Sequence, residues 1–135
     1  MRFLIDTNVI SEPRRPGPHP NVLAWFNRTD QASVFISTLT LGELVRGVAK
    51  AARRDAAAGV RLKAWVDAIQ VDFADRIIDV DRDIAVRWGE LTSLRTMPTV
   101  DCLLAATALV RGMTLVTRNT RDVARTGARV LNPFV

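Results

Sequence analysis

Five polar side chains carry most of the chemistry that this sequence offers, and each follows a predicted strand or opens a predicted helix: Asp6, Glu43, Asp101, Asn119 and Asp122. In a parallel sheet such positions meet at one edge, so we expect at least three carboxylates in one cleft. Like charges at close range raise one another's pKa, and a divalent cation relieves that conflict. Hard oxygen ligands, with no available thiol or imidazole, favour Mg²⁺ or Mn²⁺ over zinc.

Each of these residues also has a purely structural explanation. Asp6 could form a turn or cap a helix. Thr40 and Glu43 match a capping box, and a glutamate turned back to its own helix could not also project into a cleft. Asp101 could be stabilised by its helix dipole, behind Thr99 as the cap. The last two polar residues of the set are suited to turns.

A second acidic run, from Asp79 to Asp83 with Glu90 beyond it, nearly fits the calcium-binding loop. That loop needs glycine at its sixth position, where this chain has Ile84. The residues that follow have helical spacing. We therefore predict that Asp81 or Asp83 caps a helix and that no calcium loop forms.

Several enzyme classes lack their residues here. His19 is the only histidine and lies in a proline-rich loop, which argues against a Ser-His-Asp hydrolase or a histidine-based ribonuclease. Neither a GxxxxGK[ST] phosphate loop nor a GxGxxG motif is present. Phosphodiester hydrolysis still fits the acidic residues, because a bound metal lowers the pKa of water and neutralises charge in the transition state.

Length and composition favour one globular domain over residues 1–135, with 48% hydrophobic residues. No apolar run is long enough to span a bilayer, no signal peptide is recognisable, and the single cysteine, Cys102, is expected in the core, so we predict a cytoplasmic protein without a membrane partner. The net charge is +5, and all but two of the 19 basic residues are arginine. This charge favours nucleic acid as a partner, although a GC-rich genome would also enrich arginine.

Short apolar strands alternate with helices, which predicts βαβ units around a parallel sheet. Such a sheet binds ligands beyond the carboxyl ends of its strands. A proline-rich loop is expected over 13–20. The predicted strands are 3–5, 33–37, 76–80, 113–117 and 129–131, and the predicted helices are 21–28, 40–52, 55–73, 84–94 and 100–110.

Five blocks, in order along almost the whole chain, resemble the PIN-domain ribonuclease toxins of the VapC family, including FitB-like members: LIDTNVISE, STLTLGEL, TVDCLLAATAL, TLVTRNTRDV and LNPF. The resemblance implies an α/β, Rossmann-like PIN domain with a central parallel sheet of about four or five short strands flanked by helices. It also implies a Mg²⁺-dependent endoribonuclease in a type II toxin–antitoxin system, inhibited by a VapB-type antitoxin. A homodimer is implied too, and apolar faces on helices 40–52 and 55–73 fit either a dimer or an antitoxin groove.

By position, Asp6, Glu43 and Asp101 match the three core acids of the family, as catalytic and metal-binding residues. The fourth family position, often aspartate, falls on Asn119, and Asp122 three residues later is the other candidate for the second-metal ligand. Both assignments stay open.

Neighbouring side chains are expected to contact the substrate or metal-bound water: Thr7, Asn8, Thr117 and Arg118. Arg121 is a further candidate phosphate contact, and Arg14 and Arg15 are more distant ones. Arg46 lies one helical turn after Glu43 and could contact phosphate or have its place taken by the antitoxin. For each arginine, a solvated surface position is the alternative.

Three other functions compete with a ribonuclease. A phospho-receiver would need paired acids after the first strand and a lysine after a late strand, both of which are missing here. A DNA nuclease would share the same acids. A non-catalytic PIN-fold module that binds RNA or a partner is the remaining alternative.

Overall fold

The computed structural model describes residues 1–135 and contains one five-stranded, fully parallel sheet in the order β3-β2-β1-β4-β5. The strands are β1 (Phe3–Ile5), β2 (Val34–Ser37), β3 (Ile77–Ile78), β4 (Thr114–Val116) and β5 (Arg129–Leu131). The predicted α/β class with a central parallel sheet is therefore confirmed, and the number of strands is five.

The long helices begin and end within two residues of their predicted bounds: α2 (Pro20–Arg28), α3 (Thr38–Arg54), α4 (Ala56–Asp72), α5 (Arg82–Leu94) and α6 (Thr99–Arg111). Four short elements were not predicted: α1 (Thr7–Ser11), the 3₁₀ turns η1 (Glu12–Arg14) and η2 (Gln31–Ser33), and α7 (Thr120–Ala124). The loop expected over 13–20 is shorter than predicted. Its first two residues belong to η1, and its last residue, Pro20, is the first residue of α2. None of the helices is both long and apolar enough to cross a membrane.

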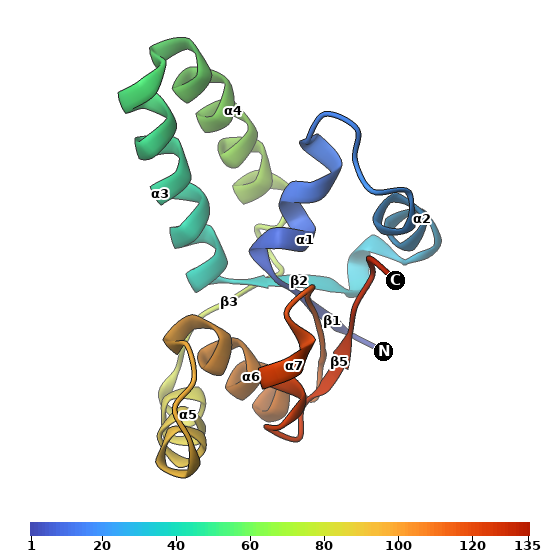
Figure 1. The fold of residues 1–135 in the computed structure, drawn as a ribbon, viewed down its shortest axis with the longest axis vertical. Coiled ribbons are helices and arrows are strands. Elements are labelled where there is room, and N and C mark those ends of the chain that lie inside the picture. The colour runs from blue at the N-terminus through green and yellow to red at the C-terminus, as the bar shows by residue number, and fades with distance from the viewer.

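Alternating strand residues build one core on each face of the sheet. Ile5 and Ile36 face a cluster completed by residues of α1, α2, α3 and α4. Leu4 and Leu115 face the opposite cluster, formed with α6 and α7. Figure 1 shows this division, with the α3–α4 hairpin, α1 and α2 on one side of the sheet and α5 and α6 on the other. Cys102 is buried in α6, as predicted for the core.

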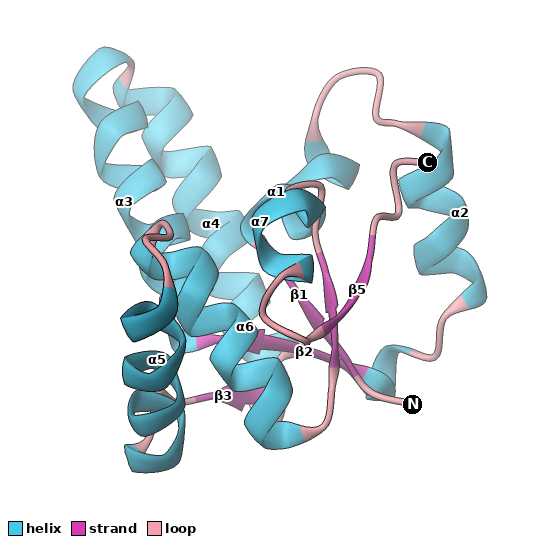
Figure 2. Cartoon of the chain, turned by 60° about the horizontal axis from the view of Figure 1, so that its bottom comes forward, coloured by secondary structure: helices cyan, strands magenta, loops and turns pink.

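The chain changes direction across the sheet between β1 and β4. From central β1 it moves outward to β2 and β3, and then returns to the other side of β1 for β4 and β5 (Figure 2). Such a switch point leaves a crevice beyond the carboxyl ends of the two central strands. Asp6 and Thr117 directly follow β1 and β4 there.

Two of the predicted helix caps are wrong and one is confirmed. Helix α3 begins at Thr38 because the Ser37 hydroxyl accepts from the Leu39 N–H at 3.0 Å, so Thr40 is already inside the helix. The N-cap of α6 is Pro98 and makes no side-chain cap. The Asp81 carboxylate accepts from the Ile84 N–H at 3.0 Å and caps α5. Most of the acidic run that resembled a calcium-binding loop therefore lies at the N-cap and in the first turns of α5.

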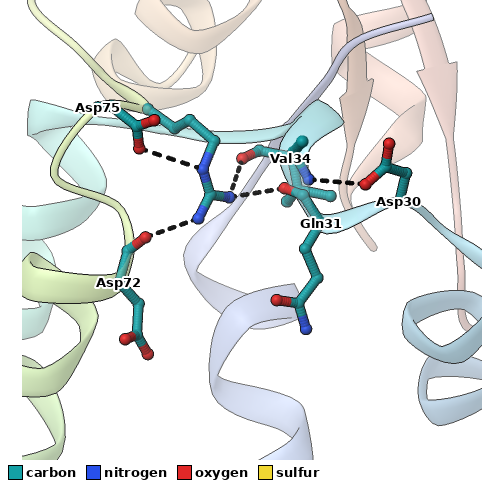
Figure 3. Close-up of polar contacts among 7 residues, drawn as sticks. Asp30, Gln31, Val34, Asp72 and Asp75 are labelled. Carbon is teal, nitrogen blue, oxygen red and sulfur yellow. Dashed lines mark hydrogen bonds and ion pairs between the residues drawn. The ribbon is translucent and has the colours of Figure 1, made fainter.

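Arg76 fixes the end of α4 to the start of β2. Its guanidinium donates to the carbonyl oxygens of Gln31, Val34 and Asp72 at 2.7, 2.8 and 2.6 Å, and lies 3.5 Å from the Asp75 carboxylate (Figure 3). These contacts bring a charged donor to three backbone carbonyl groups, one of which, that of Gln31, already accepts from the Val34 N–H. They fix the chain between α4 and β3, and with it the outer strand.

Close packing of α3 against α4 depends on Gly59. A Cβ built at Gly59 would lie 2.6 Å from the Cβ of Ala52 and 2.7 Å from its Cα, a separation that side-chain carbons do not tolerate. The two helices can therefore approach this closely only with glycine at position 59.

We expect Gly59→Ala to lower the free energy of unfolding by about 1–3 kcal/mol, because the new methyl group must push the helices apart. Gly89→Ala is the matched control: Gly89 lies within α5 with open space around its Cα, so alanine there should stabilise by about 0.5–1 kcal/mol. Urea unfolding measures both. Equal effects of the two substitutions would contradict the close approach.

Candidate active site

Asp6 is the buried centre of the site. Only 6% of its surface is exposed, and both carboxylate oxygens accept hydrogen bonds. Oδ1 accepts from the Thr7 N–H at 2.7 Å, which makes Asp6 the N-cap of α1, and Oδ2 accepts from the Thr117 hydroxyl at 2.8 Å. Burial raises the pKa of Asp6, the two threonine hydrogen bonds lower it, and the nearby Glu43 charge raises it. Asp6 therefore caps α1, as the structural explanation predicted, and its role in metal binding and catalysis stays a prediction.

Glu43 is connected to Asp6 through hydrogen bonds of one residue, Thr7. The Thr7 hydroxyl donates to Glu43 Oε1 at 2.6 Å, and Arg46 lies 3.7 Å from Oε2. The capping box predicted for this glutamate does not form, because Ser37 caps α3 instead. Glu43 consequently projects towards the carboxyl edge of the sheet, while Thr40, the other member of the predicted box, is buried with an unpartnered hydroxyl.

Asp101 brings a third carboxylate from α6. Burial raises its pKa, and the charges of Asp6, Glu43 and Asp122 raise it further, in that order. Asp101 is thus close enough to the other three acids for their charges to act on its pKa. The four acids come from four separate segments of the chain.

A wholly polar cleft of about 460 Å³ adjoins Asp101, lined by Asp101, Arg118, Asn119, Thr120, Arg121 and Asp122. Asn119 is the N-cap residue of α7 but makes no side-chain capping bond, so its amide is not committed to the helix. Carboxylate and amide oxygens thus line one side of the region, and two arginines lie beside them. Such a surface suits an anionic ligand bound next to a cation.

The residues predicted to contact substrate have partners within the protein. The hydroxyls of Thr7 and Thr117 donate to the site carboxylates. Asn8 joins the two central loops: its Oδ1 accepts from the Arg118 N–H at 3.3 Å, and its amide nitrogen lies 3.4 Å from Asp6 Oδ2. We infer that these three side chains position the acidic residues, and contact with substrate stays a prediction.

Arg118 is held in place by an aromatic ring that sequence reasoning did not single out as functional. Its guanidinium carbon lies 3.8 Å from the ring centroid of Phe134, and Phe134 is itself buried. The block LNPF marked this region only through a family resemblance. No local pattern shows that a residue near the C-terminus supports one that follows β4, because that contact depends on the sheet order.

The donor set fits a hard divalent cation. It consists of carboxylate and amide oxygens, and the only cysteine and histidine have other roles: Cys102 is buried in α6, and the His19 ring nitrogen caps α2. No group of three or more His, Cys, Asp or Glu side chains is placed to hold a metal ion. Mg²⁺ is usually bound through one or two carboxylates and keeps several of its waters, so the carboxylates present are compatible with this ion.

The sequence profile of the PIN domain matches residues 3–128. The chain belongs to the PIN-domain family. It is 33% identical to the toxin FitB of Neisseria gonorrhoeae, with 98% of each chain covered, and 30% identical to a VapC ribonuclease of Sinorhizobium fredii, with 98% of this chain and 97% of the relative covered. The crystal structure of FitAcB from Neisseria gonorrhoeae superposes with a TM-score of 0.90 at 32% identity, covering 98% of each chain. The resemblance to VapC and FitB toxins drawn from the sequence is confirmed.

The raised pKa of Asp101 predicts a pH-dependent effect of removing its charge. Because the folded pKa lies above the ordinary value of 3.8, the folded state binds protons more readily than the unfolded chain, and stability falls as pH rises through that window. Asp101→Asn, studied without divalent cations, should therefore be more stable than the wild type at neutral pH. This advantage should shrink as the pH falls towards about 4.

Thermal unfolding across that pH range measures the difference. Asp75→Asn is the control, because its side chain is 87% exposed and lies outside the cluster. A stability advantage of Asp101→Asn that does not change with pH would show that neither burial nor the neighbouring acids raise the pKa of this carboxylate.

Proposed function

We propose that this protein is a Mg²⁺- or Mn²⁺-dependent endoribonuclease and the toxin of a type II toxin–antitoxin pair. The observation that carries the proposal is the convergence of Asp6, Glu43, Asp101 and Asp122 at the switch point of the sheet, where the other acids raise the pKa of Asp101. The full-length relatives support the substrate class and the toxin role, because one is named a toxin and another a ribonuclease.

Asp6, Glu43 and Asp101 would hold the ion, with Asp122 and Asn119 as the candidates beside the adjoining cleft. When bound, the ion lowers the pKa of water and neutralises negative charge on the phosphate. Thr7 and Thr117 keep the carboxylates oriented through their hydroxyls. Arg118 and Arg121 line the same cleft, where their guanidinium groups contact phosphate oxygens.

A cognate VapB-type antitoxin and a toxin homodimer complete the proposal. Exposed apolar side chains remain on the helices after folding: Val45, Val60, Val71, Val86 and Leu94 are all more than half exposed. Such residues are available for association with another chain. Arg46 lies 3.7 Å from Glu43 at the rim of the site and is the guanidinium whose place an antitoxin arginine would take.

Asp6→Asn should reduce Mg²⁺-dependent RNA cleavage by roughly 100-fold or more and relieve growth inhibition. The fold should persist, because asparagine can still accept from the Thr7 N–H and no longer buries a charge. Cleavage is measured with total bacterial RNA, with and without EDTA, and circular dichroism checks the fold. Cleavage by Asp6→Asn at the wild-type rate would overturn the assignment of the site.

RNA that is bound but left intact by the wild type, with either cation, would instead favour a non-catalytic PIN-fold module. Parallel reactions with DNA of the same sequence test the remaining alternative, a DNA nuclease.

Mg²⁺ or Mn²⁺ should raise the melting temperature, because it binds the folded protein and relieves carboxylate repulsion. At ten times the dissociation constant the expected increase is roughly 4 °C. Asp6→Asn should lose most of this increase, and Glu90→Gln, on the exposed side of α5, should keep it. A flat titration of the wild type into the millimolar range would count against a metal site.

A further inference from the structure

A second groove opens from the other side of the carboxylate region. This cavity of about 250 Å³ lies between α1 with η1 and the α3–α4 hairpin, which Figure 1 shows next to each other. Thr7 and Glu43 line it together with two arginines, Arg14 and Arg15, and with five other residues: Ser11, Leu44, Gly47, Leu62 and Trp65. It is therefore continuous with the candidate active site. Its two arginines carry the charge opposite to that of Glu43, and Trp65 adds an aromatic ring.

Arg14 and Trp65 form a stacked pair in this groove. The Arg14 guanidinium carbon lies 4.9 Å from the ring centroid of Trp65, within the range of cation–π contacts. Trp65 is half-buried, and it also lines an apolar cavity of about 200 Å³ with Phe26 and Phe73. Packing therefore fixes the ring, and the ring in turn supports the exposed guanidinium.

Glu12 fixes the segment that carries both arginines. Its side chain is buried, its Oε2 accepts from the His19 N–H at 3.0 Å, and its Oε1 lies 3.5 Å from Arg15. Arg14 has no carboxylate within ion-pair distance. Glu12 thus partly neutralises the charge of Arg15, whereas Arg14 keeps its full charge and lies on the ring of Trp65.

We propose that this groove binds a nucleotide of single-stranded RNA next to the cleaved bond, with the base stacked on the Arg14–Trp65 pair and a phosphate contacted by Arg15. The inference rests on the proposed ribonuclease function and specifies how its substrate is held. Unpaired bases stack on aromatic rings and on guanidinium planes, and arginine also binds phosphate. An acidic peptide would need the positive charge of Arg14 but not its flat face.

The sharpest test is Arg14→Lys, which removes the flat guanidinium group and keeps the positive charge. Affinity is measured in EDTA, so that no cleavage occurs, with a fluorescent RNA of about 10 nucleotides and with an abasic ribose-phosphate oligomer of the same length. Arg14→Lys should weaken binding of the base-bearing RNA roughly five-fold or more and leave the abasic oligomer unaffected. Arg14→Ala should weaken the binding of both oligomers. Arg87→Ala, on the opposite side of the sheet, should change neither the affinity for the base-bearing RNA nor the ratio of the two affinities.

Tryptophan fluorescence gives a second reading. The chain has three tryptophans, and only Trp65 lines the groove. RNA should change the emission of the wild type and of Trp88→Phe, and this change should be lost in Trp65→Phe, which keeps an aromatic ring for packing.

Either measurement can overturn the inference. In the affinity measurement, the contradicting result is equal weakening of both oligomers by Arg14→Lys, or no weakening of either. In the fluorescence measurement, it is an RNA-induced emission change that survives in Trp65→Phe, or an emission change that an acidic peptide produces and RNA does not. If the wild type cleaves RNA with Mg²⁺ while either outcome is found, the base-stacking groove is rejected and the proposed function stands. If the wild type neither cleaves nor binds RNA, the proposed function fails as well.

Discussion

The hydrogen bond from the Thr117 hydroxyl to Asp6 Oδ2 joins the ends of the two central strands, and the remaining site is arranged around it. Thr117 follows β4 and Asp6 follows β1, so the bond spans the switch point of the sheet at 2.8 Å. The Asn119 N–H donates to the same Thr117 oxygen at 3.1 Å, which extends the contact into α7. A buried carboxylate must have such partners, because an unpaired charge in the core would destabilise the fold by several kcal/mol.

Charge repulsion at this edge is tolerated but not relieved within the protein. The hydrogen bonds to Asp6 oppose the effect of burial on its pKa, whereas burial and the three neighbouring carboxylates all raise the pKa of Asp101. No group of three or more of these side chains is placed to hold a metal ion. The cation that we propose for this edge is therefore one that needs only one or two carboxylates and keeps several of its waters.

The long periodic elements could be predicted from the sequence, and the short ones could not. The apolar run of α6 and the amphipathic spacing of α3 identify buried or half-buried helices because their patterns extend over many residues. α1 and α7 have only five residues each, and their polar residues fit a turn as well as a helix. Ser37 and Thr40 are both good caps, and only the position where β2 ends decides between them. The acids were identified because they follow predicted strands or open predicted helices. The supports from Phe134 and Trp65 depend on tertiary contacts that leave no local signal.

The tight crossing at Gly59 connects the groove with the acidic cluster. Glu43 lies in α3 and Trp65 in α4, and these two helices meet at Gly59 and Ala52 with no space for an added Cβ. A substitution that widens this crossing would also change the separation between the tryptophan ring of the groove and the glutamate of the acidic cluster. The spacing of these two side chains is thus set by the packing of one helical hairpin.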